Sequence, residues 1–214
     1  MEMETKSSKI FRRVPSQSRS RMLVHSVLAA TRRILPSEDF RRFTTQKVAD
    51  VAGIGIGSLY EYFHSKESIL QFVLEREIDR NLAQFESRLE ELQETDLGAI
   101  SDSLIDHFFD YFYTQKRLMH NLLFSLPREV TAGVILQSRI QVTDKLEKLL
   151  VRRFAHLGAE PDLRARLFFV VNTTLECIHS YFFIEEQGTP LLTKQFYKEN
   201  IRVIARAVLR QSSV

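Results

Sequence analysis

Hydroxyl and ammonium groups gather in residues 44–66, which read TTQKVADVAGIGIGSLYEYFHSK. In the second half of this stretch the donors are Ser58, Tyr60, Tyr62 and Lys66. Such side chains donate hydrogen bonds to phosphates and base edges, and an apolar side chain such as Ile56 can touch a thymine methyl group. Glu61 is the one acid among residues 56–66. This chemistry predicts a surface that contacts nucleic acid.

The same stretch predicts the two short helices that would position these donors. Thr44 or Thr45 supplies an N-cap oxygen for the first helix, and Gly53 sits where that helix must end and turn sharply. Leu59 and Phe63, four residues apart, give the second helix its buried side. The pattern predicts a helix-turn-helix, whose second helix enters the major groove of DNA. A helical corner without a ligand is the alternative, and the exposed donors argue against it.

Residues 18–70 resemble the DNA-binding domain of the tetracycline-repressor (TetR) family of transcriptional regulators. The resemblance is carried by the AG turn, the LYEYF segment and the SKESIL segment that follows. It implies phosphate contacts from Thr44, Tyr60, Tyr62 and Lys66, and base or groove contacts near Gln46, Gly55, Ile56, Gly57 and Ser58. Gly55 stands where the family usually has serine, so a hydroxyl is lost, although glycine still caps a helix at small cost.

The amino-terminal end of the chain is basic. Residues 1–70 hold 12 Lys and Arg against 7 Asp and Glu, a balance of +5, and the remaining residues hold 18 against 20. We expect residues 1–17 to form a flexible arm whose cations reach phosphates or the minor groove. A disordered tail is the alternative for its first ten residues. The full set of predicted DNA contacts is Thr44, Thr45, Gln46, Gly55, Ile56, Gly57, Ser58, Tyr60, Tyr62, Lys66, Arg12, Arg13 and Arg19.

The rest of the chain carries helical periodicity and no strand pattern. The predicted fold is all-α, with about nine helices: a helix-turn-helix domain over residues 18–65 and a larger helical domain over residues 66–214. An apolar content of 44% in 214 residues is enough for a real core. The single cysteine, Cys177, excludes an internal disulfide framework and fits a cytoplasmic protein. No apolar run approaches the roughly 20 residues that span a bilayer, so we expect no membrane partner.

The segment 161–187 is apolar on nearly every side and must be covered all round. A two-fold interface of four helices, made by this helix and the last one, would cover it. The resemblance implies the same homodimer, which fits the reading of a palindromic operator by two recognition helices. The predicted dimer residues are Phe169, Phe182, Phe183, Phe196 and Ile204.

Aromatic side chains are also enriched in the larger domain. Core packing explains any single phenylalanine, but together with polar groups among apolar neighbours they could line a small-molecule site. The resemblance implies such a pocket for an unidentified, mostly apolar ligand. The predicted lining is Phe108, Phe112, Phe124, Phe168, Asn172 and Glu176.

The sequence carries no pattern for catalysis or for a cofactor. Cys177 and His179 lie two residues apart on a predicted helix and point away from each other, so we predict no metal site. The glycines of residues 53–57 lack the preceding strand and the spacing of a phosphate-binding loop. We expect no enzyme. The leading hypothesis is a ligand-released repressor; the alternatives are a DNA-binding organiser without a small-molecule switch and a helical small-molecule carrier.

Overall fold

The computed structural model describes residues 10–37, 42–91, 97–186, 188 and 192–209. These residues form eight α-helices and two short 3-10 helices, and none of them belongs to a strand, apart from an isolated bridge between Phe11 and Phe63. The predicted all-α fold is confirmed. Contacts divide the chain into two compact units, which are described separately: residues 1–78 with 117–132, and residues 79–116 with 133–214.

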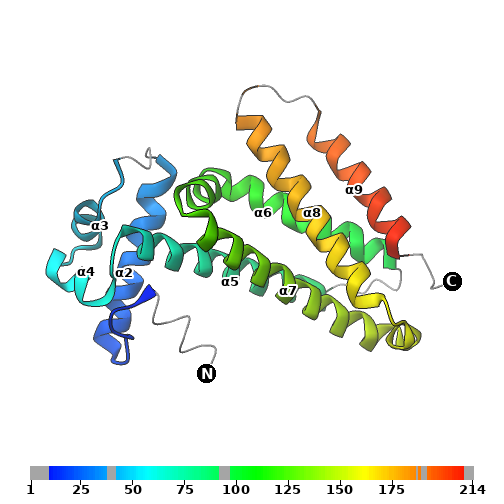
Figure 1. Ribbon diagram of the computed structural model, residues 1–214, viewed down its shortest axis with the longest axis horizontal. Coiled ribbons are helices and arrows are strands. Elements are labelled where there is room, and N and C mark those ends of the chain that lie inside the picture. Colours follow the sequence, from blue (N-terminus) through cyan, green and yellow to red (C-terminus); the bar gives the residue numbers. More distant parts are fainter. Residues whose placement is uncertain (1–9, 38–41, 92–96, 187, 189–191, 210–214) are drawn as a thin grey trace. The chain divides into compact units, whose positions relative to one another are not determined.

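Unit 1 contains a three-helix cluster (Figure 1). Its helices are α2 (Ser18–Ile34), α3 (Thr45–Ala52) and α4 (Ile56–Tyr62), and the 3-10 turn η1 (Leu35–Ser37) follows α2. Apolar side chains recur on one face of α2 at helical spacing, and Val27 and Ile34 are buried there against Val48 and Leu59 of the cluster core. The cluster therefore has a core of its own.

Parts of three longer helices complete unit 1. The first half of α5 (Lys66–Glu91) contributes Glu77, whose buried carboxylate lies 3.1 Å from Arg32 of α2. The end of α6 (Leu97–Ser125) contributes Asn121, whose amide donates to the carbonyl of Leu35 at 2.6 Å. The compact units thus do not follow the predicted boundary between residues 65 and 66.

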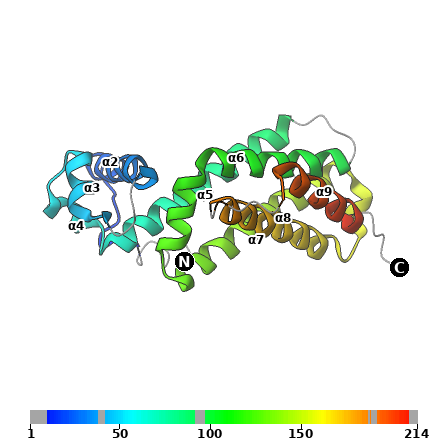
Figure 2. The ribbon, with the colours of Figure 1, turned by 90° about the horizontal axis from the view of Figure 1, so that it is seen from above.

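Unit 2 holds the remaining helical mass, in which α8 (Leu163–Glu186) and α9 (Lys194–Leu209) lie side by side (Figure 2). The rest of unit 2 comes from the second half of α5, most of α6, most of α7 (Arg128–Arg153) and the turn η3 (Ala155–Ala159). Within α6, Gln115 has non-helical angles (φ −109°, ψ 16°), so this long helix is kinked there.

Three aspartates on α6 face four cations on α9. Lys198 lies 2.7 Å from Asp106, and Arg202 donates to both carboxylate oxygens of Asp106 at 2.8 and 2.9 Å. The complete ladder pairs Asp102, Asp106 and Asp110 with Lys194, Lys198, Arg202 and Arg206. Both sets repeat every four residues, the spacing that places side chains on one helix face. The ladder therefore holds α9 against α6 along one edge.

Among the described residues, one helix is long and apolar enough to cross a membrane by length and composition. It spans Leu163–Glu185, with a mean hydropathy of 1.4. The sequence prediction that no run approaches this length was therefore wrong. The finding is weak support for a membrane span, because core helices of soluble proteins pass the same test. Arg164 and Glu176 within it are ion-paired to Asp144 and Arg139 of α7.

Candidate nucleic-acid interface

The first motif helix, α3, is fixed at both ends by local interactions. The Thr44 hydroxyl accepts a hydrogen bond from the backbone N–H of Lys47 at 3.2 Å, so Thr44 is the N-cap. Gly53 ends the helix in the left-handed region, with φ 67° and ψ 33°. The N–H of Ile54 then bonds to the carbonyl of Ala49 at 3.0 Å, which closes a Schellman-type turn. The predicted cap and turn are confirmed.

The second motif helix, α4, begins directly after the turn with Gly55 as its N-cap. Gly55 offers no side-chain cap, but its carbonyl accepts the N–H of Leu59 at 3.2 Å. Leu59 and Phe63 are fully buried, as their spacing predicts. The loss of the serine that the family usually has therefore leaves α4 intact.

The outward side of α4 presents part of the predicted set. Gly55, Gly57 and Tyr60 are exposed, and Ile56 and Ser58 are half-buried. The Tyr60 hydroxyl lies 2.9 Å from the hydroxyl of Thr45, so the two motif helices bring two oxygens together at the surface. Such a pair can donate to one phosphate oxygen or to adjacent ones. On α3, Gln46 is exposed and its amide donates to Asp50 at 2.8 Å.

Tyr62 is a correction to the predicted outward face. Its side chain is only 8% exposed, whereas Tyr60 is 40% exposed. Tyr62 follows Leu59 by three residues, and this spacing places it on the buried side of the helix. The side chain of Tyr62 therefore contributes to the core of unit 1.

Part of the amino-terminal arm packs against the carboxyl end of the helix-turn-helix motif. Ile10 is buried, and the ring of Phe11 lies 5.2 Å from the rings of both Phe63 and Phe72. The N–H of Arg12 donates to the carbonyl of Tyr62 at 2.8 Å. The flexible arm expected over residues 1–17 is therefore packed at Ile10 and Phe11, because these apolar side chains join the core; residues 12–14 are exposed, and residues 1–9 lie outside the described part.

Cations surround this packed arm and the start of α5. The side chains of Arg12, Arg13 and Arg19 are exposed, and Lys66 at the first position of α5 is half-buried. The N–H of Ser68 donates to the hydroxyl of Ser65 at 3.4 Å, and the N–H of Ser65 donates to the hydroxyl of Ser68 at 3.1 Å. These reciprocal bonds cap the helix that presents Lys66.

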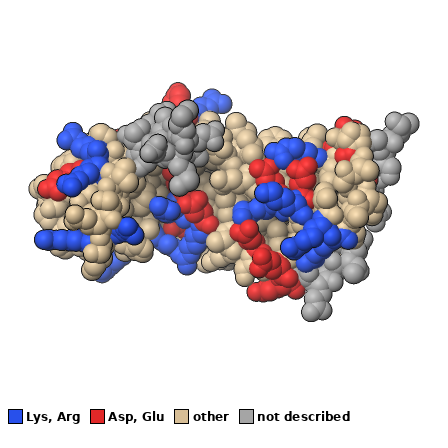
Figure 3. All heavy atoms as spheres, turned by 90° about the horizontal axis from the view of Figure 1, so that it is seen from below, with Lys and Arg blue, Asp and Glu red and all other residues tan. Residues whose placement is uncertain are grey.

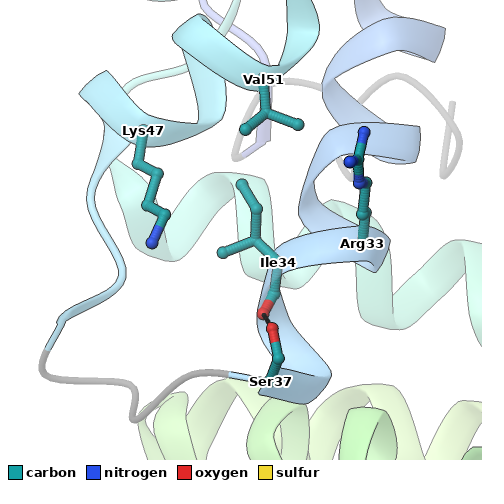
Figure 4. Close-up of a pocket in the computed structure, with 5 residues that line it drawn as sticks. All are labelled: Arg33, Ile34, Ser37, Lys47 and Val51. Carbon is teal, nitrogen blue, oxygen red and sulfur yellow. Dashed lines mark hydrogen bonds between the residues drawn. The ribbon is translucent and has the colours of Figure 1, made fainter.

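Two further cations of the motif were missed by sequence reasoning. Arg33 and Lys47 line a surface pocket of about 260 Å³, together with Ile34, Ser37 and Val51. Figure 4 shows Lys47 and Arg33 on opposite sides of Ile34, and Ser37 bonds to the Ile34 carbonyl at 3.0 Å. In the sequence, the only indication of these two cations is the excess of Lys and Arg over Asp and Glu in residues 1–70. On the face drawn in Figure 3, unit 1 carries mostly Lys and Arg, and unit 2 carries both signs.

The predicted ligand residues do not all share one environment. Phe108 and Phe112 are buried and Phe168 is half-buried, all in unit 2. Phe124 belongs to unit 1, is 62% exposed and stacks on His120 with ring centroids 4.6 Å apart. Phe124 is a correction, because an exposed side chain does not line an apolar interior.

Asn172 and Glu176 meet an arginine that sequence reasoning did not single out. Arg139 of α7 donates to Asn172 at 2.6 Å and to Glu176, both on α8. His179 lies one turn further along α8, with its ring 4.8 Å from that of Phe112. Burial lowers the pKa of His179 to about 4, with an opposing contribution from Glu176. Unit 2 therefore contains a polar cluster around the buried Arg139, next to aromatic rings.

The predicted dimer residues divide into two groups. Phe169, Phe183, Phe196 and Ile204 are between 39% and 52% exposed, and Val203 of α9 is 67% exposed. Phe182 is 8% exposed and packs against Phe109 and Tyr181 within unit 2. Phe182 is therefore a correction: it is a core residue. The exposed members form an apolar surface on α8 and α9 of a single chain.

Comparisons with known proteins agree with this geometry. Residues 27–73 match the family model for bacterial regulatory proteins of the tetR family. The chain is 23% identical over 161 residues to an HTH-type transcriptional regulator of Staphylococcus aureus (strain MRSA252), which covers 74% of this chain and 80% of that protein.

Solved structures share the fold. A TetR-family transcriptional regulator from Streptomyces coelicolor superposes with a TM-score of 0.62 at 20% identity, over 89% of this chain and 99% of that one. The regulator FadR from Bacillus subtilis, solved in complex with stearoyl-CoA, gives a TM-score of 0.58 at 15% identity, over 87% and 97%.

Proposed function

We propose that this chain, which belongs to the TetR family of DNA-binding transcriptional regulators, is a homodimeric repressor that a small, mostly apolar ligand releases from its operator. The observation that carries the DNA-binding part is the paired hydroxyls of Thr45 and Tyr60, presented by α3 and the outward side of α4. We expect the protein to act in the cytoplasm, where its DNA is.

The contacts that we assign follow from exposure and donor chemistry. Thr44, Thr45, Tyr60 and Lys66 contact phosphates, and Ile56 and Ser58 lie in the groove. Gln46 contacts base edges in the groove, and the glycines Gly55 and Gly57 allow close approach of the backbone. Arg12, Arg13 and Arg19 extend the phosphate contacts from the packed arm. We assign no DNA contact to Tyr62, because its side chain is buried.

The apolar surface of α8 and α9 supports a homodimer. Exposed phenylalanines such as Phe169 and Phe196 are unusual on a surface that faces only water, and a large apolar patch marks an interaction site. A two-fold axis would pair this surface with itself. It would also present two α4 helices to the two halves of a palindrome.

Ligand release requires that the ligand prefer one conformer of the dimer. A shift from 1:99 to 99:1 needs a preference of about 5.5 kcal/mol, because tight binding to both conformers alike shifts nothing. The aromatic core of unit 2, with Phe108 and Phe112, supports an apolar ligand. The regulator FadR from Bacillus subtilis, which has a similar fold, was solved in complex with stearoyl-CoA, a molecule with a long apolar acyl chain, and this supports the proposal.

A gel-shift titration with a palindromic fragment of the protein's own promoter tests the DNA-binding assignment. Tyr60→Phe combined with Lys66→Ala should weaken binding strongly and reduce the dependence of affinity on salt. Tyr62→Phe is the matched control and should bind as wild type does. Full retention by the double variant would refute the assigned contacts. Binding that no candidate ligand weakens would favour an organiser without a switch.

A further inference from the structure

In the polar cluster of unit 2, one hydrogen-bond donor has no acceptor. The side chain of Arg139 is nine-tenths buried, with 10% of its surface exposed, and its Nε–H is buried without a hydrogen-bond partner. Nη1 bonds to Asn172 and Nη2 to a single oxygen of Glu176. A buried donor without an acceptor costs about 1–3 kcal/mol, so this guanidinium could gain from a further oxygen.

The unused donor lies on the edge of the guanidinium that suits a carboxylate. Nε–H and Nη2–H point in parallel, and this fork binds both oxygens of a carboxylate at once. Glu176 uses only the Nη2 half of the fork. The Glu176 side chain is 57% exposed, against 10% for Arg139. In a single chain Glu176 can therefore return to water at low cost, whereas Arg139 cannot.

Buried apolar side chains lie near the cluster. Val142 lies one turn from Arg139 on α7, Leu175 lies one turn from Asn172 on α8, and both are buried. The hydroxyls of Ser138 and Thr143 on α7 are already committed to the carbonyls of Ile135 and Arg139, at 2.7 and 2.8 Å. Phe112 adds an aromatic ring beside His179. A molecule whose charge met Arg139 would place the rest of its body against hydrocarbon.

We propose that Arg139 anchors the ligand of this regulator, and that the ligand is a carboxylic acid with an apolar body whose carboxylate takes the Nε–Nη2 fork in place of Glu176. The proposal rests on the ligand-released repressor described above and names the class of its ligand. Asn172 holds the other side of the guanidinium in position, and His179 lies within the same cluster as a neutral neighbour.

Displacement of Glu176 would also couple ligand binding to the stability of the dimer. Glu176 follows Phe169 by seven residues and precedes Phe183 by seven, which places all three on one face of α8. A ligand that takes Arg139 therefore frees an unpaired carboxylate on the apolar surface proposed for dimerisation. An unpaired charge disfavours burial there, and this supplies a difference between the liganded and unliganded dimers.

The test uses calorimetric titration of the full chain, without DNA, with two probes of equal body: dodecanoate below its micellar concentration, and dodecan-1-ol. We expect dodecanoate to bind wild type at least about tenfold more tightly than the alcohol, the gain of a charge-assisted bidentate pair. Arg139→Met should remove this difference. Glu176→Gln should tighten dodecanoate binding several-fold, because the competing carboxylate is gone.

The matched control is Arg164→Met, which removes an equally paired arginine on α8, exposed and bonded to Asp144 and Glu147. It should leave both affinities unchanged. Equal affinity of wild type for acid and alcohol would overturn the proposal, as would absence of dodecanoate binding up to millimolar concentration. If the Arg139→Met protein does not fold, the Glu176→Gln protein provides the test. Unchanged or weaker binding of dodecanoate to it would overturn the proposal that Arg139 binds the ligand carboxylate.

The outcome separates this proposal from the repressor function on which it rests. Dodecanoate that binds through Arg139 but leaves the gel shift unchanged would support the anchor and refute release by ligand. Release of DNA by a ligand whose affinity does not depend on Arg139 would support the repressor and overturn the anchor.

Discussion

Val203 offers the sharpest test of the proposed dimer, because it is the most exposed apolar side chain of α9, at 67%. Val203→Ala removes two methyl-sized groups, worth about 1.6 kcal/mol when fully buried at about 0.8 kcal/mol each. Weighted by the exposed fraction, this is about 1 kcal/mol per chain. A two-fold interface contains the residue twice, so the dimer should lose about 2 kcal/mol, which is about a 30-fold higher dissociation constant.

The measurement is sedimentation equilibrium over a series of concentrations, without DNA. The folded chain itself should keep its stability, since the deleted groups face solvent and alanine favours helix more than valine does. Met22→Ala is the control, because Met22 is 71% exposed but lies on α2 of unit 1. A dissociation constant of the Val203→Ala protein equal to that of wild type would refute the use of this surface.

Three further predictions concern the arm, the buried histidine and the charge ladder. Arg12→Ala with Arg13→Ala should lower the slope of log affinity against log salt in DNA titrations by about two, one for each lost phosphate contact, and an unchanged slope would contradict these contacts. His179 stays neutral in the fold, with a pKa of about 4, but takes up a proton near the ordinary histidine pKa of 6.5 when unfolded. The unfolded state therefore binds more protons between these values, and stability should fall by about 3 kcal/mol as pH drops from 6.5 to 4. His179→Gln should flatten that profile in urea denaturation, and a profile as steep as wild type would exclude the histidine as its source. Asp106→Asn should cost about 1–2 kcal/mol of unfolding free energy at low salt and less at high salt, because its two partners are partly exposed cations; a loss that is independent of salt would argue against an electrostatic role.

The helix-turn-helix could be predicted from the sequence because each of its signals is local. The cap by Thr44, the left-handed turn at Gly53 and the burial of Leu59 and Phe63 each depend on residues within a few positions. Such interactions are encoded by spacing alone. The resemblance to a known family then added the expectation of which hydrogen-bond donors contact DNA.

The errors came from contacts between distant segments or from helix geometry at the end of an element. The anchor at Phe11 joins rings more than 50 residues away in the sequence, so no local pattern predicts it. Tyr62 was assigned to the outer face, although its spacing of three from Leu59 also fits the inner one. Arg139 finds Asn172 across 33 positions, and only the fold brings them together.

The two edges of α9 have separate roles. One edge is fixed to α6 by charges that repeat every four residues, and the opposite edge, with Phe196 and Val203, faces away from its own chain. In the proposed dimer, substitutions on the outer edge would therefore alter which chains pair without weakening the fold that presents them. Duplicated copies of such a regulator could in this way evolve into non-pairing variants by changing a few side chains of one helix.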